Sequence, residues 1–192
     1  MNVTQAIAST DSSRNNLLKI AAAGVLTGIL TPLLVPLADY IVGTSGDFWI
    51  ALVAIPFAVL VFVLVKRAGG NPNWAAPAAA IVTMIAFVGA VNAAIWIDGQ
   101  AHEANKLVRN ILSGLAGGFV GAAIMALGIA LLPAGSRAAT AWLPMLLTGT
   151  LAGSLMALDN ALELDLTSVL YPVWQAGVAT GLAIALRRTR AS

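Results

Sequence analysis

The chain contains no cysteine and a single histidine, His102, among its 192 residues. Without cysteine there are no disulfides, thiolate metal sites, iron–sulfur clusters or cysteine nucleophiles. A single histidine also excludes bis-histidine haem ligation and the common histidine-rich metal sites. We therefore expect neither a metal ion nor a cofactor.

Charge is scarce as well, since 9% of the residues are charged while 59% are hydrophobic. An average soluble domain is about 25% charged, so a soluble body of this size could not cover its surface with so few charges. The net charge is +2, and the basic residues stand singly or in pairs between long apolar runs. This is not the basic patch of a nucleic-acid-binding protein. The composition excludes a water-soluble enzyme and favours a multi-span membrane protein.

The common catalytic motifs are missing. His102 and Glu103 are not followed by the second histidine of a zinc protease, and the acidic segment 159–165 lacks the glycine and the spacing of a calcium loop. There is no nucleophile elbow, no P-loop and no dinucleotide fingerprint. We expect that the protein is not an enzyme, and a membrane enzyme acting on lipid is the most distant interpretation.

Long apolar runs dominate the chain, and a helix of about 20 mostly apolar residues can cross a bilayer. Six segments meet this requirement: 20–42, 48–65, 74–97, 111–132, 138–158 and 166–186. They contain one formally charged residue, Asp39, and short loops separate them. The sequence therefore predicts an all-α membrane protein. Residues 17–188 form a compact bundle of six transmembrane helices, preceded by a flexible polar tail at 1–16.

The charges are distributed asymmetrically between the two sides of this predicted bundle. If the N-terminus is inside, eight of the ten basic residues lie on the inner side, and Lys106 and Arg109 remain outside. By the positive-inside rule, both termini are cytoplasmic, and the short loops favour a bacterial inner membrane. The outer side then carries a net charge of −5. Such a field would concentrate cations or basic solutes, although the rule by itself leaves acidic residues outside.

The two halves of the chain share a short similarity. A shift of 90 residues aligns Leu17, Lys19, Gly24 and Gly28 with Leu107, Arg109, Gly114 and Gly118. Three spans per half would place the halves in opposite orientations, which is the usual build of secondary transporters. A 3+3 inverted repeat is one interpretation. The other is chance, because helices rich in alanine, glycine and leucine align easily.

Glycines four residues apart recur in the first, fourth, fifth and sixth spans. The pairs are Gly24/Gly28, Gly114/Gly118, Gly117/Gly121, Gly149/Gly153 and Gly177/Gly181. Missing side chains at this spacing let helix backbones approach closely. We expect packing within one bundle, with dimerisation as the alternative. The second span has no glycine and many large side chains, so we expect it to face lipid.

The first span has a polar face near its outer end. Thr31 and Asp39 lie on one side of a helix weakened by Pro32 and Pro36, because proline removes a backbone donor. Burial of an ionisable group in a membrane costs several kcal/mol. Asp39 therefore either lines a cavity or reaches the outer membrane surface. We expect it to pair with Arg109.

The deepest polar residues are in the sixth span. Ser168, Tyr171 and Gln175 follow steps of three and four, and Gln175 is the tenth residue of that span. A primary amide near the membrane centre must find partners. Asn92 in the third span and Asn110 at the start of the fourth are the natural companions. These side chains predict a polar cavity that opens outward, and interhelical hydrogen bonds are the alternative.

These observations predict a small transporter, channel or solute-binding membrane subunit. The alternative is a non-catalytic accessory or assembly subunit of a larger membrane complex, which would use its glycine faces for docking. The expected partners are the lipid bilayer, a small solute or cation, and another copy or subunit. The candidate path residues are Asp39, Asn92, Arg109, Asn110, Ser168, Tyr171 and Gln175.

Overall fold

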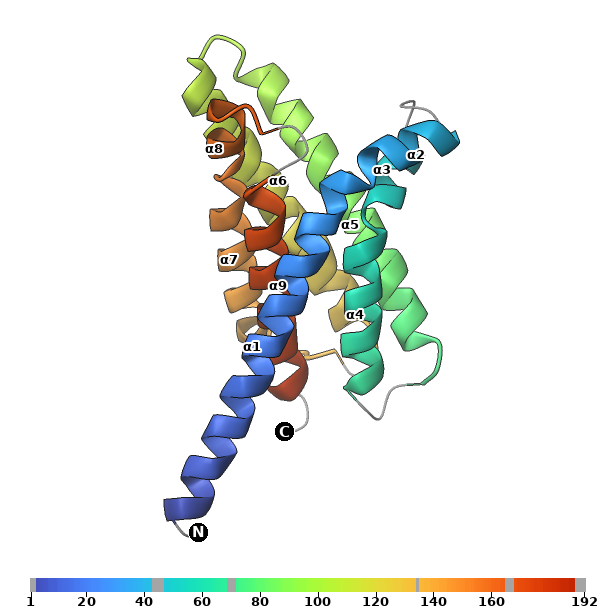
Figure 1. Ribbon diagram of the computed structural model, residues 1–192, viewed down its shortest axis with the longest axis vertical. Helices are drawn as coiled ribbons and strands as arrows, with labels where there is room; N and C mark the ends of the chain where they lie inside the picture. Colours follow the sequence, from blue (N-terminus) through green and yellow to red (C-terminus); the bar gives the residue numbers. More distant parts are fainter. Residues whose placement is uncertain (1–2, 43–46, 69–71, 134, 165–167, 189–192) are drawn as a thin grey trace.

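A computed structural model describes residues 3–42, 47–68, 72–133, 135–164 and 168–188, and these residues contain helices and no strand. The helices are α1 (Val3–Leu33), α2 (Val35–Val42), α3 (Asp47–Val53), α4 (Ile55–Arg67), α5 (Ala75–Gln100), α6 (Lys106–Ala130), α7 (Leu143–Gly153), α8 (Met156–Ala161) and α9 (Leu170–Arg188). A short 3-10 turn at Ala139–Ala141 precedes α7. The predicted all-α class is confirmed. Helix α1 begins within the segment 1–16 that we expected to be a tail, and Figure 1 shows its first turns projecting from the bundle.

Within the part of the chain that the structure describes, three helical segments are long and apolar enough to cross a membrane. They are Arg14–Leu33 of α1, the whole of α5 and the whole of α6. They coincide with the first, third and fourth predicted spans. Large apolar side chains such as Leu26, Ile81 and Leu127 are exposed on them, which water would penalise and lipid would not. These helices indicate a membrane protein built as a helical bundle.

Two helical breaks occur next to prolines. Leu34 separates α1 from α2, and Ala54 separates α3 from α4. Pro36 and Pro56 then stand at the second position of the helix that follows, where a missing backbone donor costs little. A proline ring would clash with the carbonyl four residues earlier in a continuous helix. The first and second predicted spans are therefore divided helices.

The third break, between α7 and α8, has no proline. The Ser154 amide bonds to the Leu151 carbonyl at 3.2 Å, and the Leu155 amide bonds to the Ala152 carbonyl at 3.0 Å. These are the i→i−3 bonds of a tightened turn. The Ser154 hydroxyl also donates to the Leu151 carbonyl at 2.7 Å, a local bond that bends helices.

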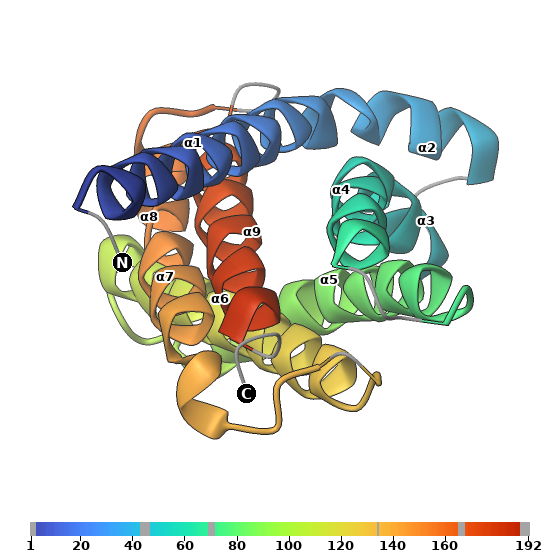
Figure 2. The same cartoon turned by 90° about the horizontal axis from the view of Figure 1, so that it is seen from below.

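Helix α9 lies in the middle of the bundle. It contacts α1, α4, α6 and α7, and Figure 2 shows it between α1 on one side and α6 and α7 on the other. Val178, Ala179 and Leu182 are fully buried. Because neighbouring helices cover α9, this helix tolerates more polar side chains than a helix facing lipid.

Aromatic packing joins α9 to α4. Trp174 of α9 is buried, with 7% of its surface exposed. Its ring and that of Phe57 form a T-shaped contact, with centroids 5.7 Å apart. The prediction that the second span faces lipid is wrong for one face, because Phe57, Val61 and Val65 of α4 are buried. Large side chains therefore fill the space between α4 and α9. At other contacts in the bundle, glycines let the helix backbones approach more closely.

Close backbone approach occurs at the glycine pairs. A Cβ atom at Gly24 would lie 2.6 Å from the Cα atom of Ala176 on α9, and one at Gly181 would lie 2.7 Å from the Cα atom of Met145 on α7. A Cβ atom at Gly153 would collide with the Gly114 carbonyl. Glycine is therefore required where α1 crosses α9, where α7 crosses α9 and where α6 crosses α7.

The aligned glycines do not pack as the 90-residue repeat would require. Gly24 packs on α9, whereas its aligned counterpart Gly114 packs on α7. The shift equates the sixth span, α9, with the third span, α5. An inverted repeat would therefore place Gly114 against α5.

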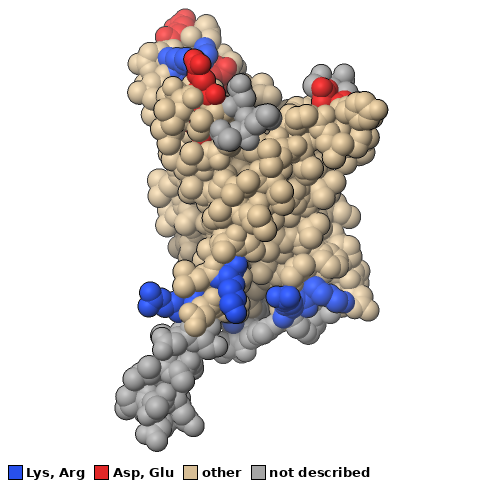
Figure 3. All heavy atoms as spheres, viewed as in Figure 1, with Lys and Arg blue, Asp and Glu red and all other residues tan. Residues whose placement is uncertain are grey.

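Charged side chains occupy the two ends of the bundle. On the face seen in Figure 3, a band of Lys and Arg lies at one end, Asp and Glu with some basic side chains lie at the other, and the waist between the two ends is uncharged. The basic end includes Lys66 and Arg67, the last residues of α4. Helix α9 ends at the basic end, and α1 begins on the same side (Figure 1).

Candidate functional site

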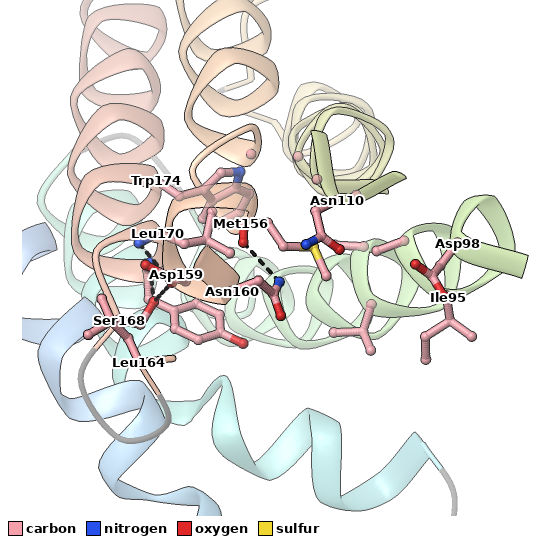
Figure 4. A pocket seen from close by; sticks show the side chains of 18 of the residues that line it. Ile95, Asp98, Asn110, Met156, Asp159, Asn160, Leu164, Ser168, Leu170 and Trp174 are labelled. Carbon is pink, nitrogen blue, oxygen red and sulfur yellow. Dashed lines mark hydrogen bonds between the residues drawn. The ribbon is translucent and has the colours of Figure 1, made fainter. Parts of the chain in front are cut away.

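A cavity of about 880 Å³ opens at the acidic end, between α5, α6, α8 and the start of α9. Figure 4 shows side chains from these helices lining it. Its volume falls within the range of roughly 300–1,000 Å³ that is usual for small-molecule sites. The cavity can therefore hold one small organic molecule.

Glycines make room for this cavity. Gly114, Gly117 and Gly118 of α6 line it together with Gly153 of α7. All four are buried. Glycine thus has two consequences here: it brings the helices together, and it leaves a wall without side chains beside their crossing.

Three aromatic rings form another part of the wall: Phe87 of α5 and Tyr171 and Trp174 of α9. The rings of Phe87 and Tyr171 stack with centroids 5.8 Å apart and planes inclined by 25°. Trp174 follows Tyr171 by three residues, so both project from the same face of α9. The rings give the cavity a large polarisable surface.

The Asp159 carboxylate lies at the edge of the cavity and caps α9 from α8. It accepts hydrogen bonds from the Leu170 amide at 3.3 Å and the Ser168 hydroxyl at 2.5 Å (Figure 4). It also accepts one from the Val169 amide at 2.9 Å. The Ser168 hydroxyl in turn accepts from the Tyr171 amide at 3.3 Å. These bonds satisfy the first amides of α9, and a negative charge suits the positive end of the helix dipole. The cap therefore fixes α8 and the aromatic face of α9 relative to each other.

Arg109 pairs with Asp98, so the predicted pair with Asp39 is wrong. The Arg109 Nε atom lies 2.9 Å from the Asp98 Oδ1 atom. Asp98 is near the end of α5 and Arg109 is near the start of α6, so the short α5–α6 connection brings them together. Asp39 lies on α2 beyond the break at Leu34, is exposed, and does not line the cavity.

The cavity brings together part of the predicted path. The predicted residues that line it are Arg109, Asn110, Ser168 and Tyr171. Asn92 does not line it; this side chain is exposed, and its Nδ2 atom donates to the Val88 carbonyl of its own helix at 3.0 Å. Gln175 is fully buried, and its Nε2 atom donates to the Thr31 Oγ1 atom at 2.8 Å. Gln175 therefore follows the alternative interpretation, an interhelical hydrogen bond between α9 and α1.

Sequence reasoning did not assign Phe87, Met156, Asn160 or Trp174 to the site, although all four line the cavity. The one available signal was the three-residue step from Tyr171 to Trp174, which places both on one face of α9. The position of α8 across the start of α9 depends on long-range packing that no local pattern reveals.

No group of three or more His, Asp or Glu residues within the described ranges could hold a metal ion. Comparison of the chain with protein-family models, with curated proteins and with solved structures found no match. The site must therefore be interpreted from its own geometry and chemistry.

Proposed function

We propose that the chain is an integral membrane protein that crosses the bilayer six times. In this arrangement α1 with α2, α3 with α4, and α7 with α8 each form one span, and α5, α6 and α9 form the others. The tightened turn at Ser154 supports this proposal, because its i→i−3 bonds keep the backbone satisfied through the break. The uncharged waist in Figure 3 supports it too. The basic end would face the cytoplasm of a bacterial cell.

Within this membrane protein, the cavity supports a solute-binding function, as a small transporter or as a binding subunit. The observation that carries the proposal is a cavity of about 880 Å³ with a glycine and aromatic wall and a charged rim. Lys106, Asp98 and Glu163 belong to that rim. In the proposed orientation the cavity opens to the outside. The fitting solute has an apolar part that contacts the lining, and it also carries a polar or charged group.

An accessory role based on glycine docking has less support. Each predicted glycine pair packs against another helix of the same chain: Gly24 on α9, Gly149 on α6 and Gly177 on α7. These faces are therefore already covered within the bundle. The solute-binding proposal instead uses a cavity that the chain leaves open.

Cysteine labelling tests the proposal directly, since the natural chain has no cysteine that must first be removed. Met156 lines the cavity, whereas Met145 is fully buried at the crossing of α7 with α9. We expect a water-soluble methanethiosulfonate carrying a trimethylammonium group to modify the Met156→Cys protein in lipid nanodiscs. The matched Met145→Cys protein should stay unmodified. If Met156→Cys is as unreactive as Met145→Cys in the folded protein, the cavity is not open to water and the proposal is wrong.

A further inference from the structure

We propose that the cavity binds an organic cation, namely an ammonium that carries apolar substituents. This inference rests on the proposed solute-binding function and names its substrate class. Three features carry it: the aromatic wall, an acidic side chain whose charge is not neutralised, and an apolar lining. Each feature excludes a different class of competing ligand.

The aromatic wall favours a cation because the faces of aromatic rings carry partial negative charge. Phe87, Tyr171 and Trp174 all line the cavity. The indole of Trp174 is the type of ring that attracts cations most strongly. Its T-shaped contact with Phe57 helps to fix its position. An ammonium seated against this wall would gain attraction that a neutral or anionic ligand would not.

The Asp159 carboxylate supplies a full negative charge next to this wall. Its hydrogen-bond donors are two backbone amides and the Ser168 hydroxyl, all of them neutral. Asp159 takes no part in the Arg109–Asp98 ion pair, and none of the hydrogen bonds that it accepts comes from a charged side chain. A cationic ligand would neutralise this carboxylate without breaking the cap of α9.

An anionic ligand is disfavoured by the same charge distribution. Two basic side chains line the cavity, Lys106 and Arg109. Arg109 is held by Asp98 at 2.9 Å, and Lys106 is exposed at the rim. Asp159 would repel a carboxylate or phosphate seated against the aromatic wall. Neither basic side chain would offset this repulsion, because Arg109 is paired and Lys106 lies at the rim.

An inorganic cation is disfavoured by the ligands available. Calcium and magnesium require about six or more oxygen ligands, most of them from protein or water. Within the described residues no cluster of three metal-binding side chains occurs. Ile95, Met156, Leu164 and Leu170 also line the cavity, and they contact carbon more favourably than a hydrated ion. The charge of the ligand is therefore expected on an alkylated or arylated nitrogen.

Three probes of similar size distinguish these classes: benzyltrimethylammonium, benzyl alcohol and benzenesulfonate. The binding of each is measured by calorimetry on the full chain in maltoside micelles, which carry no ammonium group, with empty micelles subtracted. We expect benzyltrimethylammonium to bind at least about tenfold more tightly than the other two. Equal or tighter binding of benzyl alcohol or benzenesulfonate would overturn the cation proposal while leaving a solute cavity in place.

Three variants locate the interaction. Asp159→Asn removes the charge but keeps an oxygen to cap α9, and we expect the affinity for benzyltrimethylammonium to fall about tenfold. Asp39→Asn removes the same charge from an exposed position on α2 that does not line the cavity, and it should change affinity by less than about twofold because solvent and salt screen it. Trp174→Leu should weaken binding about tenfold. If that variant does not fold, Trp174→Phe keeps a ring and should weaken binding by a smaller factor.

These results separate the two proposals. If Met156→Cys reacts and benzyltrimethylammonium does not bind, the cavity exists but the cation proposal is wrong. If Met156→Cys is unreactive, the solute-binding proposal itself is wrong. Equal losses of affinity in Asp159→Asn and Asp39→Asn would show a general surface field, and that result would also overturn the proposed site.

Discussion

The Gln175 Nε2 atom donates a hydrogen bond to the Thr31 Oγ1 atom at 2.8 Å, and this bond joins α9 to α1 across 144 positions of sequence. Both side chains are fully buried. The Thr31 hydroxyl donates in turn to the Thr27 carbonyl at 3.0 Å. The Gln175 Oε1 atom has no hydrogen-bond partner within the described part of the chain. The amide is therefore half-satisfied, and its contribution is to helix association, away from the cavity.

This geometry predicts that Thr31→Val is more destabilising than Gln175→Met. The valine removes the acceptor and leaves the Gln175 amide nitrogen buried without a partner, at a cost of about 1–2 kcal/mol. The methionine removes the whole amide, including its unpaired oxygen, and Thr31 keeps its bond to Thr27. The free energy of unfolding, measured in detergent with both variants in parallel, checks this order. A Gln175→Met protein that is less stable than Thr31→Val would contradict it.

The crossing of α6 with α7 predicts a large effect of a single methyl group. A Cβ atom at Gly153 would collide with the backbone of Gly114, so the helices must separate. We expect Gly153→Ala to lose about 1–3 kcal/mol of stability, as other overpacked sites do. Gly99 of α5 is the matched control, because a Cβ atom there would have no neighbour within 4 Å. Gly99→Ala should be neutral or stabilising by up to about 1 kcal/mol. Equal thermal stability of the two variants would show that the crossing is looser than described.

The Arg109–Asp98 pair predicts a small but specific coupling energy. The two side chains are 33% and 43% exposed, so solvent screening limits the coupling to about 0–1 kcal/mol, and salt should reduce it further. A double-mutant cycle with Arg109→Gln and Asp98→Asn measures this energy. A second cycle with Arg109→Gln and Asp39→Asn should give no coupling. Coupling in the second cycle alone would restore the pairing that the sequence first suggested.

The cap on α9 predicts faster hydrogen exchange when its acceptor is removed. Asp159→Ala deprives the Val169 and Leu170 amides of their acceptor, and loss of a helix cap costs about 1 kcal/mol. We expect exchange at these two amides to accelerate about fivefold in Asp159→Ala, and less in Asp159→Asn. Unchanged protection in Asp159→Ala would mean that the carboxylate does not cap the helix.

Local composition and spacing predicted the parts of the structure that depend on single helices. Long apolar runs predicted α5 and α6. The glycine spacing pointed to positions such as Gly24 and Gly181, where the structure places helix backbones in close contact. These features are readable because each one depends on residues within a few turns of one helix.

The remaining features depend on which helices become neighbours. Arg109 had several acidic side chains within reach of the outer loops, and only the short α5–α6 connection selects Asp98. Gln175 had the same polarity whether it faced a cavity or α1, and the position of Thr31 decides between them. No proline marks the break at Ser154. A serine in the sequence does not predict a break, because it bends a helix only when its hydroxyl bonds back to the preceding turn.

The central claim is that the bundle crosses a membrane with its basic end inside and its cavity outside. His102 and Asn73 lie beyond opposite ends of α5, and both are exposed. A membrane-impermeant maleimide applied to intact cells should label the His102→Cys protein. It should label the Asn73→Cys protein after the cells are permeabilised and not before. Labelling of both variants in intact cells, or of Asn73→Cys alone, would contradict the account.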